Sequence, residues 1–447
     1  MKKYIMVMVT TTLFSTLFSM LFADTVLMRG QRPTSALDSM PIRDVADTLE
    51  IEQNTEAFAQ QAEPMSGYEQ LANDDAYNSK FFEPWQLVEM DLTRTERTWQ
   101  FKYSREKTYR RSGRRIPKKW FSYQIKNSNF ANYNSLAQPA ITIKHTDLKL
   151  YPSKLEIFYN PKRTGEGFPF DYNQNSSVHM NTPIFISHYS KDKKWVYAKT
   201  SYAFGWIKYS DIAFVSSNFQ QQFQNDKYAI TVTDNLDLVE DGVKLSLVKM
   251  GTIFPMDKQT NEYLFAGKDN NGYATIKRFS PSEVNLIARK PIKFNAFNLA
   301  HISNQLVGEP YGWGGKLQSR DCSALTRDFF APFGIYLPRN SSQQAKESSG
   351  MYMSLSGLTE KEKQEAILSN AQPFRTLLYV PGHIMLYLGE RNGNPIILHN
   401  YWGVRLKSGK KRVLGRAIIT TTRIGLERSD VKKDTMLSQT LKGIVNF

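Results

Sequence analysis

Cysteine is almost absent from this chain, which has one, Cys322, in 447 residues. A single thiol cannot form a disulfide within the chain, so stability must come from hydrophobic cores. The 27 Phe, 23 Tyr and 7 Trp provide the apolar area for such cores. Histidine is also scarce, with six residues, and none lies at a spacing from Cys or acidic residues that is typical of zinc ligands. We therefore expect no metal site and no cofactor.

Long apolar runs are absent after the first 23 residues. Lys2 and Lys3 precede an apolar, hydroxylated run that ends at Phe22, and Ala23 offers a small residue for cleavage. We interpret residues 1–23 as a signal peptide, with an uncleaved membrane anchor as the alternative. This interpretation predicts an exported protein that is periplasmic or associated with the cell wall.

Negative charge is in deficit, because the chain has 58 Lys and Arg against 42 Asp and Glu, a formal net charge of +16. The densest basic cluster lies between Lys102 and Lys119. Nucleic-acid binding is the usual interpretation of such a cluster, but export argues against it, and we expect no nucleic-acid partner. An anionic cell wall as partner and a solvated basic face remain equal alternatives.

The pattern of polar and apolar residues divides the chain into five segments after residue 23. Residues 24–66 are polar and poor in aromatics, which predicts a linker. Aromatic residues begin abruptly near Phe81, which predicts a folded domain over 67–136. Short alternating runs then predict two small all-β barrels, over 137–220 and 221–292. Helical periodicity returns at Asn295, which predicts an α+β domain over 293–447 with a helix packed on an antiparallel sheet.

Cys322 follows a loop with three glycines at positions 312–315, and the residues after it are compatible with a helix. A cysteine in the first turn of a helix lies in the positive field of the helix N-terminus, which favours the thiolate. A lone cysteine is often a buried core residue, but Arg320, Asp321 and Ser323 suit a core poorly. We therefore favour Cys322 as a nucleophile.

A thiol nucleophile needs a base and a group that orients the base. His383 begins one predicted strand and His399 ends the next. A two-residue turn at Asn392-Gly393 would place the two histidines on opposite faces, whereas a loop centred on Arg391 would pair them directly. We predict the second arrangement, with His383 as base and His399 as its orienting partner; two structural histidines are the alternative.

Four separated motifs resemble those of the NlpC-type cell-wall cysteine peptidases. They are Pro310–Gly315, Arg320–Ser323, Leu337–Arg339 and Pro381–Gly389. Upstream, Gly165–Asp171 and Gly205-Trp206 resemble the bacterial SH3-like barrels that precede this peptidase in multidomain members, and residues 67–136 fit their N-terminal clip-like domain. The resemblance implies a multidomain fold in which two small all-β SH3-like barrels are followed by a papain-like α+β catalytic domain.

The resemblance also implies roles for single residues. The implied catalytic residues are Cys322, His383 and His399, and the implied substrate-binding residues are Tyr311, Trp313, Asp321 and Ser323. Asp321 and Ser323 would recognise the free amine of an N-terminal L-alanine. The implied reaction cleaves peptidoglycan stem peptides between γ-D-glutamate and the diamino acid.

Two other functions remain open. One is an amidase or acyltransferase on the same papain-like scaffold. The other is a cell-wall-binding protein whose peptidase domain is inert or occluded. For each of the three we expect a monomer.

Overall fold

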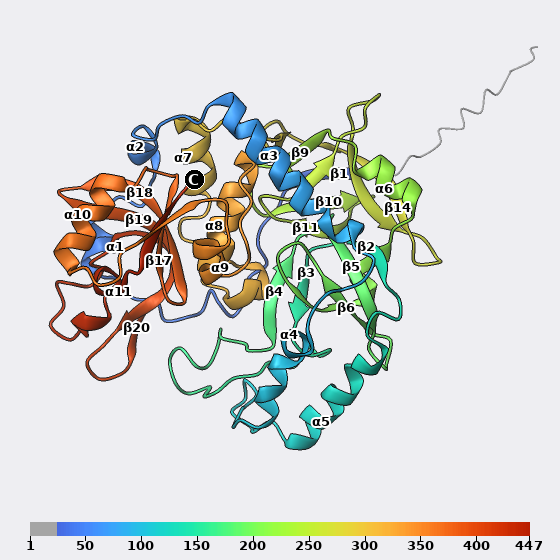
Figure 1. The fold of residues 1–447 in the computed structure, drawn as a ribbon, viewed down its shortest axis with the longest axis horizontal. Helices are drawn as coiled ribbons and strands as arrows, with labels where there is room; N and C mark the ends of the chain where they lie inside the picture. The colour runs from blue at the N-terminus through green and yellow to red at the C-terminus, as the bar shows by residue number, and fades with distance from the viewer. Residues whose placement is uncertain (1–24) are drawn as a thin grey trace, which may run out of the picture.

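The computed structural model describes residues 25–447, so the predicted signal peptide lies outside the described residues. Figure 1 shows two β-rich bodies beside a C-terminal domain, with helices at the top and bottom of the molecule. No helix between residues 25 and 447 is both long and apolar enough to cross a membrane. The predicted fold class, a multidomain chain with β-rich bodies before an α+β domain, is confirmed.

The first barrel is a seven-stranded sheet with the order β4-β3-β7-β6-β5-β2-β8. Its strands are β2 (Gln138–Thr142), β3 (Thr146–Lys149), β4 (Gln174–Val178), β5 (Pro183–Tyr189), β6 (Trp195–Lys199), β7 (Phe204–Lys208) and β8 (Ile212–Phe214). Ile184, Ile186, Val196, Ala198 and Ile207 are fully buried in its core. The segment 137–220, whose short alternating runs predicted a β barrel, therefore forms one β sheet with its own core.

The second barrel consists of two sheets around one core. A three-stranded sheet has the order β12-β9-β15, and a five-stranded sheet has the order β11-β10-β1-β14-β13. The strands are β1 (Thr25–Arg29), β9 (Tyr228–Thr231), β10 (Leu236–Glu240), β11 (Val243–Val248), β12 (Ile253–Pro255), β13 (Tyr263–Lys268), β14 (Ala274–Pro281) and β15 (Ile287–Arg289). The helix α6 (Ser217–Phe223) connects the two barrels.

The linker prediction for residues 24–66 is wrong. β1 pairs antiparallel with β10 and parallel with β14, and Leu27 is fully buried in the second barrel. The segment then carries α1 (Ala46–Glu50) and α2 (Glu56–Ala59) to the C-terminal domain, where the Asp47 carboxylate accepts hydrogen bonds from the backbone and hydroxyl of Thr421. We call residues 25–66 the strap. It looked like a linker because its buried apolar residues are widely spaced and enter cores that other segments form. Such residues are Leu27, Val45, Ile51, Ala59 and Met65.

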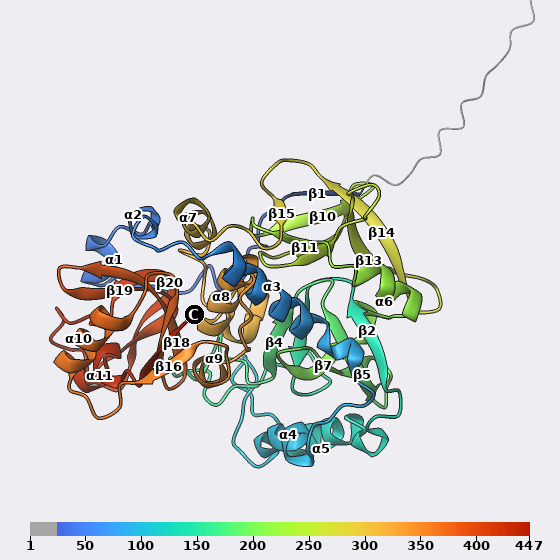
Figure 2. The same ribbon diagram turned by 45° about the horizontal axis from the view of Figure 1, so that its top comes forward.

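Residues 67–136 do not pack around one core, contrary to the single domain predicted. The helix α3 (Gly67–Phe82) packs on the second barrel, where the ring of Phe82 lies 5.5 Å from that of Tyr228, and on the C-terminal domain, where Tyr77 lies 5.7 Å from Tyr336. The turn η1 (Glu83–Gln86) packs on the first barrel, where Trp85 donates a hydrogen bond to the Ala140 carbonyl. The remaining elements are α4 (Arg94–Thr98), η2 (Trp99–Ser104), α5 (Lys118–Asn127) and η3 (Phe130–Asn132). Tyr103 and Phe121 of this group pack instead on Tyr151 and Ile157, which follow β3. Figure 2 shows α3 across the middle of the molecule, and Figures 1 and 2 both show α4 and α5 in its lower part.

The C-terminal domain has a six-stranded sheet with the order β16-β21-β17-β18-β19-β20. The strands are β16 (Met351–Ser354), β17 (Thr376–Val380), β18 (His383–Arg391), β19 (Asn394–Arg405), β20 (Lys411–Thr421) and β21 (Gly443–Asn446). The helices are α7 (Ala296–Asn304), α8 (Cys322–Phe330), α9 (Ser341–Lys346), α10 (Glu360–Asn370) and α11 (Leu437–Thr440). The short turns of this domain are η5 (Trp313–Gln318), η6 (Ala331–Phe333) and η7 (Lys433–Thr435); the turn η4 (Tyr209–Asp211) belongs to the first barrel. Helix α8 packs on β18 and β19 with Leu325 and Phe329 fully buried, so it carries Cys322 against the sheet.

Candidate active site

Cys322 is the first residue of α8 and is 6% exposed. Asp321 caps the helix, because its carboxylate accepts a hydrogen bond from the Ala324 backbone at 2.9 Å. Burial, and then the negative charge of Asp321, raise the pKa of the Cys322 thiol to about 12. The expectation that the helix terminus favours the thiolate is therefore wrong for the free protein. Loss of water around the sulfur and a carboxylate next to it outweigh the helix field.

His383 and His399 meet on one face of the sheet, although the predicted loop between them and their predicted direct pairing across the strands are both wrong. The turn is the two-residue Asn392-Gly393, with both residues at positive φ. A β-bulge at Leu388 adds one residue to β18, so Leu386 pairs with Leu398. Continuing this register places His383 on the same face as His399. Without the bulge, the two-residue turn would place His383 and His399 on opposite faces of the sheet. The extra residue brings them to the same face.

A chain of hydrogen bonds fixes the protonation of the two rings. The Thr420 hydroxyl donates to the Thr421 carbonyl, so its oxygen accepts from His399 Nε2 at 3.0 Å. His399 Nδ1 is then bare and accepts from His383 Nε2 at 2.8 Å. His383 is left with a bare Nδ1, which is the form a general base needs.

The sulfur contacts the backbone next to this base. The backbone N–H of Ile384, the residue after His383, donates a hydrogen bond to the Cys322 sulfur. Burial lowers the pKa of His383 to about 3 and holds the pKa of His399 well below its ordinary value. The free protein therefore holds a neutral thiol next to neutral imidazoles, and the thiol proton must move when a substrate arrives.

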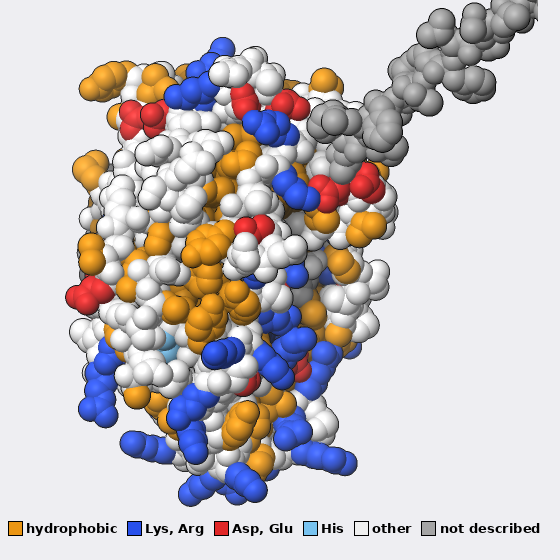
Figure 3. Space-filling model, turned by 90° about the vertical axis from the view of Figure 1, so that its right-hand side faces the viewer, with side chains coloured by type: hydrophobic (Ala, Val, Ile, Leu, Met, Phe, Trp, Pro, Cys, Tyr) orange, Lys and Arg blue, Asp and Glu red, His pale blue; other side chains and the backbone are white. Residues whose placement is uncertain are grey.

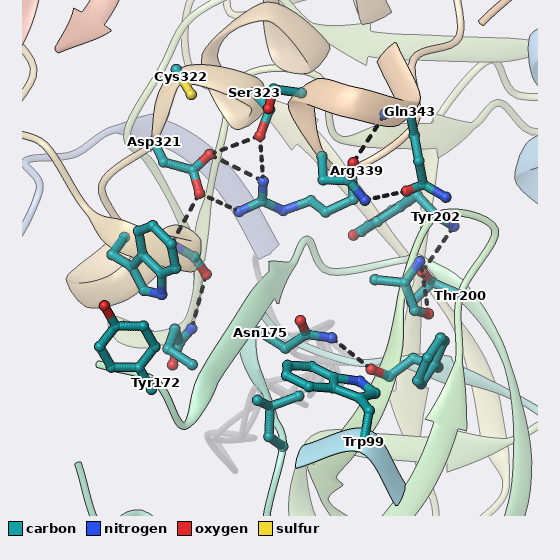
Figure 4. A pocket seen from close by; sticks show the side chains of 18 of the residues that line it. Trp99, Tyr172, Asn175, Thr200, Tyr202, Asp321, Cys322, Ser323, Arg339 and Gln343 are labelled. Atoms are coloured by element: carbon teal, nitrogen blue, oxygen red, sulfur yellow. Dashed lines mark hydrogen bonds and ion pairs between the residues drawn. The ribbon is translucent and has the colours of Figure 1, made fainter. Parts of the chain in front are cut away.

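Asp321, Ser323 and Arg339 form a buried cluster next to Cys322, and Figure 4 shows their side chains pointing toward one another. The Arg339 guanidinium donates to both oxygens of Asp321, at 3.0 and 2.8 Å, and to the Ser323 hydroxyl at 2.9 Å. Burial alone would raise the pKa of Asp321, but the charge and hydrogen bonds of Arg339 hold it below its ordinary value. Arg339 also donates to Ser176 of the first barrel at 2.8 Å. The cluster therefore joins two domains beneath the thiol.

Cys322 opens into a cavity of about 600 Å³ with walls from three parts of the chain. The C-terminal domain contributes Tyr311, Trp313 and the cluster around Asp321; the first barrel and the region around η2 contribute Tyr172, Asn175, Tyr202, Phe204, Leu92, Trp99 and Tyr103. In Figure 4 Trp99, Tyr172 and Asn175 lie across the cavity from Asp321 and Cys322. All four residues interpreted as substrate-binding thus line one cavity.

Tyr311 and Trp313 are held in place by aromatic contacts. The ring of Tyr311 lies 5.7 Å from that of Phe170 and 5.8 Å from that of Trp402, and Trp313 lies 5.3 Å from Phe170. Burial holds the pKa of Tyr311 well above its ordinary value, so its hydroxyl stays protonated.

Several residues of the site had no signal in the sequence. Thr420, which fixes the tautomer of His399, is one threonine among three in a row. Gln174 donates to the Gly314 carbonyl at 3.1 Å, and Trp99 closes the far wall of the cavity. These contacts depend on how domains pack, which no local pattern reports. For a metal, no group of three or more His, Cys, Asp or Glu among residues 25–447 is suitably placed.

Three family models match the chain. Residues 308–423 match the NlpC/P60 family, residues 14–133 match the N-terminal NLPC_P60 stabilising domain, and residues 156–208 match an SH3 domain of the SH3b1 type. No curated protein matches the chain.

Among solved structures, an NlpC/P60 endopeptidase from Photobacterium damselae subsp. piscicida is similar at 24% identity and a TM-score of 0.78, covering 91% of this chain and 98% of that one. An NlpC/P60 family protein from Bacillus cereus ATCC 10987 is similar at 14% identity and a TM-score of 0.41, covering 68% of this chain and 98% of that one. The first of these shares the fold across almost its whole length. The C-terminal domain thus matches the NlpC/P60 family model over residues 308–423, and the same chain matches the models of the SH3 domain of the SH3b1 type and of the N-terminal NLPC_P60 stabilising domain.

Proposed function

We propose that the protein is a cysteine endopeptidase that hydrolyses peptidoglycan stem peptides between γ-D-glutamate and the diamino acid. The observation that carries the proposal is the directed hydrogen-bond chain from Thr420 through His399 to His383. It leaves His383 with a bare imidazole nitrogen, and the backbone of the next residue, Ile384, donates to the only thiol of the chain, at the edge of a cavity large enough for a peptide. A purely structural pair of histidines has no need of that arrangement.

The reaction would proceed through an acyl-enzyme. His383 Nδ1 takes the proton of Cys322 as the sulfur attacks the γ-glutamyl carbonyl. The Cys322 backbone N–H, which lies in the first turn of α8 and has no partner within the helix, donates to the developing oxyanion together with the Tyr311 hydroxyl. His383 then gives its proton to the leaving amine, and water, deprotonated by the same nitrogen, releases the acid.

The proposal includes recognition of a free N-terminal L-alanine by Asp321 and Ser323. Both side chains line the cavity beside the thiol, which supports this role. However, Asp321 already accepts hydrogen bonds from Arg339, Ser323, Gly314 and Ala324. An arriving ammonium group must therefore displace one of these donors, and the Ser323 hydroxyl, at 3.3 Å, is the most weakly held.

Peptidoglycan as the substrate is supported by the match to the NlpC/P60 family and by the SH3 domain of the SH3b1 type. One similar solved structure is titled as an NlpC/P60 endopeptidase. Export to the periplasm or cell wall belongs to the same proposal and depends on the composition of residues 1–23.

The test is incubation of the chain from residue 24 with L-Ala-γ-D-Glu-meso-diaminopimelate, read by mass spectrometry. We expect release of the diamino acid, lost in Cys322→Ala and reduced at least tenfold in kcat/KM when the peptide is N-acetylated. Equal cleavage of the acetylated peptide would reject the amine recognition while leaving the bond assignment intact. Absence of any cleavage, with the chain still bound to purified wall, would favour a wall-binding protein with an inert peptidase domain. Cleavage at another amide bond would favour the amidase alternative.

A further inference from the structure

A second pocket, of about 470 Å³, lies apart from Cys322 where three parts of the chain meet. Its walls come from the loop between η2 and α5, from the first barrel and from the loop before α8. Six side chains that line it are basic, namely Arg110, Arg111, Lys149, Lys154, Lys208 and Lys316, and two are acidic, Asp147 and Glu156. None of them belongs to the cavity around the thiol.

The two buried lysines of this pocket are already neutralised. Lys316 Nζ lies 2.7 Å from Glu156 and 3.0 Å from Asp171, and Lys149 Nζ lies 3.5 Å from Asp147 and 3.6 Å from Asp171. The three carboxylates of Asp147, Glu156 and Asp171 thus surround the ammonium groups of Lys149 and Lys316, so these five side chains together have a net charge of −1.

The other four cations have no such partner. Within residues 25–447 no carboxylate pairs with Arg110, Arg111, Lys154 or Lys208, so the pocket carries a net charge of about +3 over its lining residues and Asp171. Cations gathered around a concave site repel one another. An anion that enters the site relieves this repulsion and is stabilised by the combined positive potential.

The basic side chains are presented by ordered backbone. Tyr109 and Arg115 form a β-bridge across a turn closed by Gly113 at positive φ, and Tyr109 bridges to Phe158 of the first barrel. This places Arg110 and Arg111 at the tip of a short hairpin. The Arg111 guanidinium lies 3.9 Å from the ring centre of Phe168. The backbone that carries Arg110 and Arg111 is therefore held against the first barrel, unlike that of a solvated tail.

We propose that this pocket binds an oxyanion, a phosphate or carboxylate group, carried by a polymer of the cell wall. Guanidinium groups match the paired oxygens of such groups, and lysines add charge without demanding a fixed geometry. In Figure 3 Lys and Arg side chains gather over the lower part of this face of the molecule, and Figures 1 and 2 show α4 and α5 in the lower part of the molecule. The proposal concerns attachment and does not depend on the reaction assigned to Cys322.

The chain offers a matched control for the test. Arg110 and Lys154 are exposed and line the pocket, whereas Arg114 and Arg115 are exposed on the same hairpin but do not line it. The variants Arg110→Gln/Lys154→Gln and Arg114→Gln/Arg115→Gln remove the same charge. Neither pair touches the cavity at Cys322, so hydrolysis of the free tripeptide should be unchanged in both.

The probes are pyrophosphate and citrate, titrated into the full chain with Cys322→Ala and followed by calorimetry. We expect binding that weakens with salt, and a loss of at least about tenfold in affinity for the Arg110/Lys154 variant but less than about twofold for the control. Equal losses in both variants, or no saturable binding of either probe, would overturn the proposal.

Sedimentation with purified wall then identifies the source of the anion. Binding that disappears when phosphodiester polymers are removed from the wall assigns the site to phosphate, and binding that persists on stripped wall assigns it to stem-peptide carboxylates. Wall binding that the Arg110/Lys154 variant retains in full would again overturn the proposal. Because the assay uses a variant without the thiol, its outcome is independent of whether the protein is a peptidase.

Discussion

Replacement of Arg339 by methionine would test whether the ion pair beneath the thiol holds the site together. Arg339 is 7% exposed and Asp321 8%, and the guanidinium meets the carboxylate at 3.0 and 2.8 Å. Arg339→Met keeps most of the volume and the apolar stem but leaves Asp321 buried without a counter-charge. Breaking a buried pair from one side costs about 3–5 kcal/mol, more than the pair itself contributes. We therefore expect the free energy of unfolding at pH 7 to fall by about that amount.

The loss should depend on pH. In the wild-type chain the pKa of Asp321 lies below its ordinary value, so pairing stabilises the fold above the unfolded pKa and is lost as pH falls through the folded pKa. Without Arg339, burial dominates and the pKa of Asp321 rises above that of the unfolded chain. The ionised carboxylate then destabilises the variant at neutral pH, and the cost disappears on protonation. The difference in the free energy of unfolding between Arg339→Met and the wild-type chain should therefore be smaller at pH 4 than at pH 7.

Urea denaturation at these two pH values measures both effects. The double variant Asp321→Asn/Arg339→Met, which has no buried charge left, should recover about 2 kcal/mol or more. Arg29→Met is the control, since the Arg29–Glu283 pair is 58% and 48% exposed and should contribute less than about 1 kcal/mol. A loss for Arg339→Met no larger than that of the control, or one independent of pH, would refute the reasoning.

Three further predictions concern the catalytic residues and the glycine loop. His399→Ala should lower kcat for the tripeptide by about 100-fold with KM unchanged. His399→Asn should keep part of that kcat, because the amide oxygen can accept a hydrogen bond from His383. If His399 were only structural, both variants would lower stability and leave kcat unchanged. Burial lowers the pKa of His383 to about 3 and raises that of Cys322 to about 12, so kcat/KM should stay level between about pH 5 and 8. A fall in kcat/KM toward low pH, with a midpoint near 6.5, would instead show that His383 titrates like an imidazole in water. Gly315→Ala would place a Cβ against the Ser177 hydroxyl of the first barrel at φ +80, whereas Gly308→Ala, the control, would place one in open space at φ +83. We therefore expect Gly315→Ala to lower the free energy of unfolding, measured with urea, by at least about 2 kcal/mol more than Gly308→Ala. Equal losses would mean that the loop does not pack on the barrel.

The sequence predicted the parts of the fold that depend on local pattern. Short alternating runs predicted the two barrels, and the residues after the glycine loop predicted a helix that begins at Cys322, which is α8. It failed for β1, because a strand of five residues is too short to show a clear period and its partners β10 and β14 lie far along the chain. It failed also for residues 67–136, since composition says that a segment folds but not which core it joins.

The same division holds for the site. The six histidines left few candidates for a base, and the order of the motifs selected His383. The bulge at Leu388 could not be predicted, because nothing in a run of apolar residues marks which one is left unpaired. The protonation of Cys322 could not be predicted either. The helix terminus is visible in the sequence, but the burial that outweighs it arises from the sheet and the barrel packed around the sulfur.

The site of this chain is therefore built by several domains and not by the NlpC/P60 domain alone. Strand β4 of the first barrel donates through Gln174 to the Gly314 carbonyl and accepts from Arg339 through Ser176. The first contact holds the loop that leads to Cys322, and the second holds the guanidinium that neutralises Asp321. Removal of the barrel would expose Arg339 and free the glycine loop at once. The orientation of the nucleophile and the shape of the cavity then depend on one interface, so a change in specificity and a loss of thiol positioning should accompany each other in any variant that loosens it.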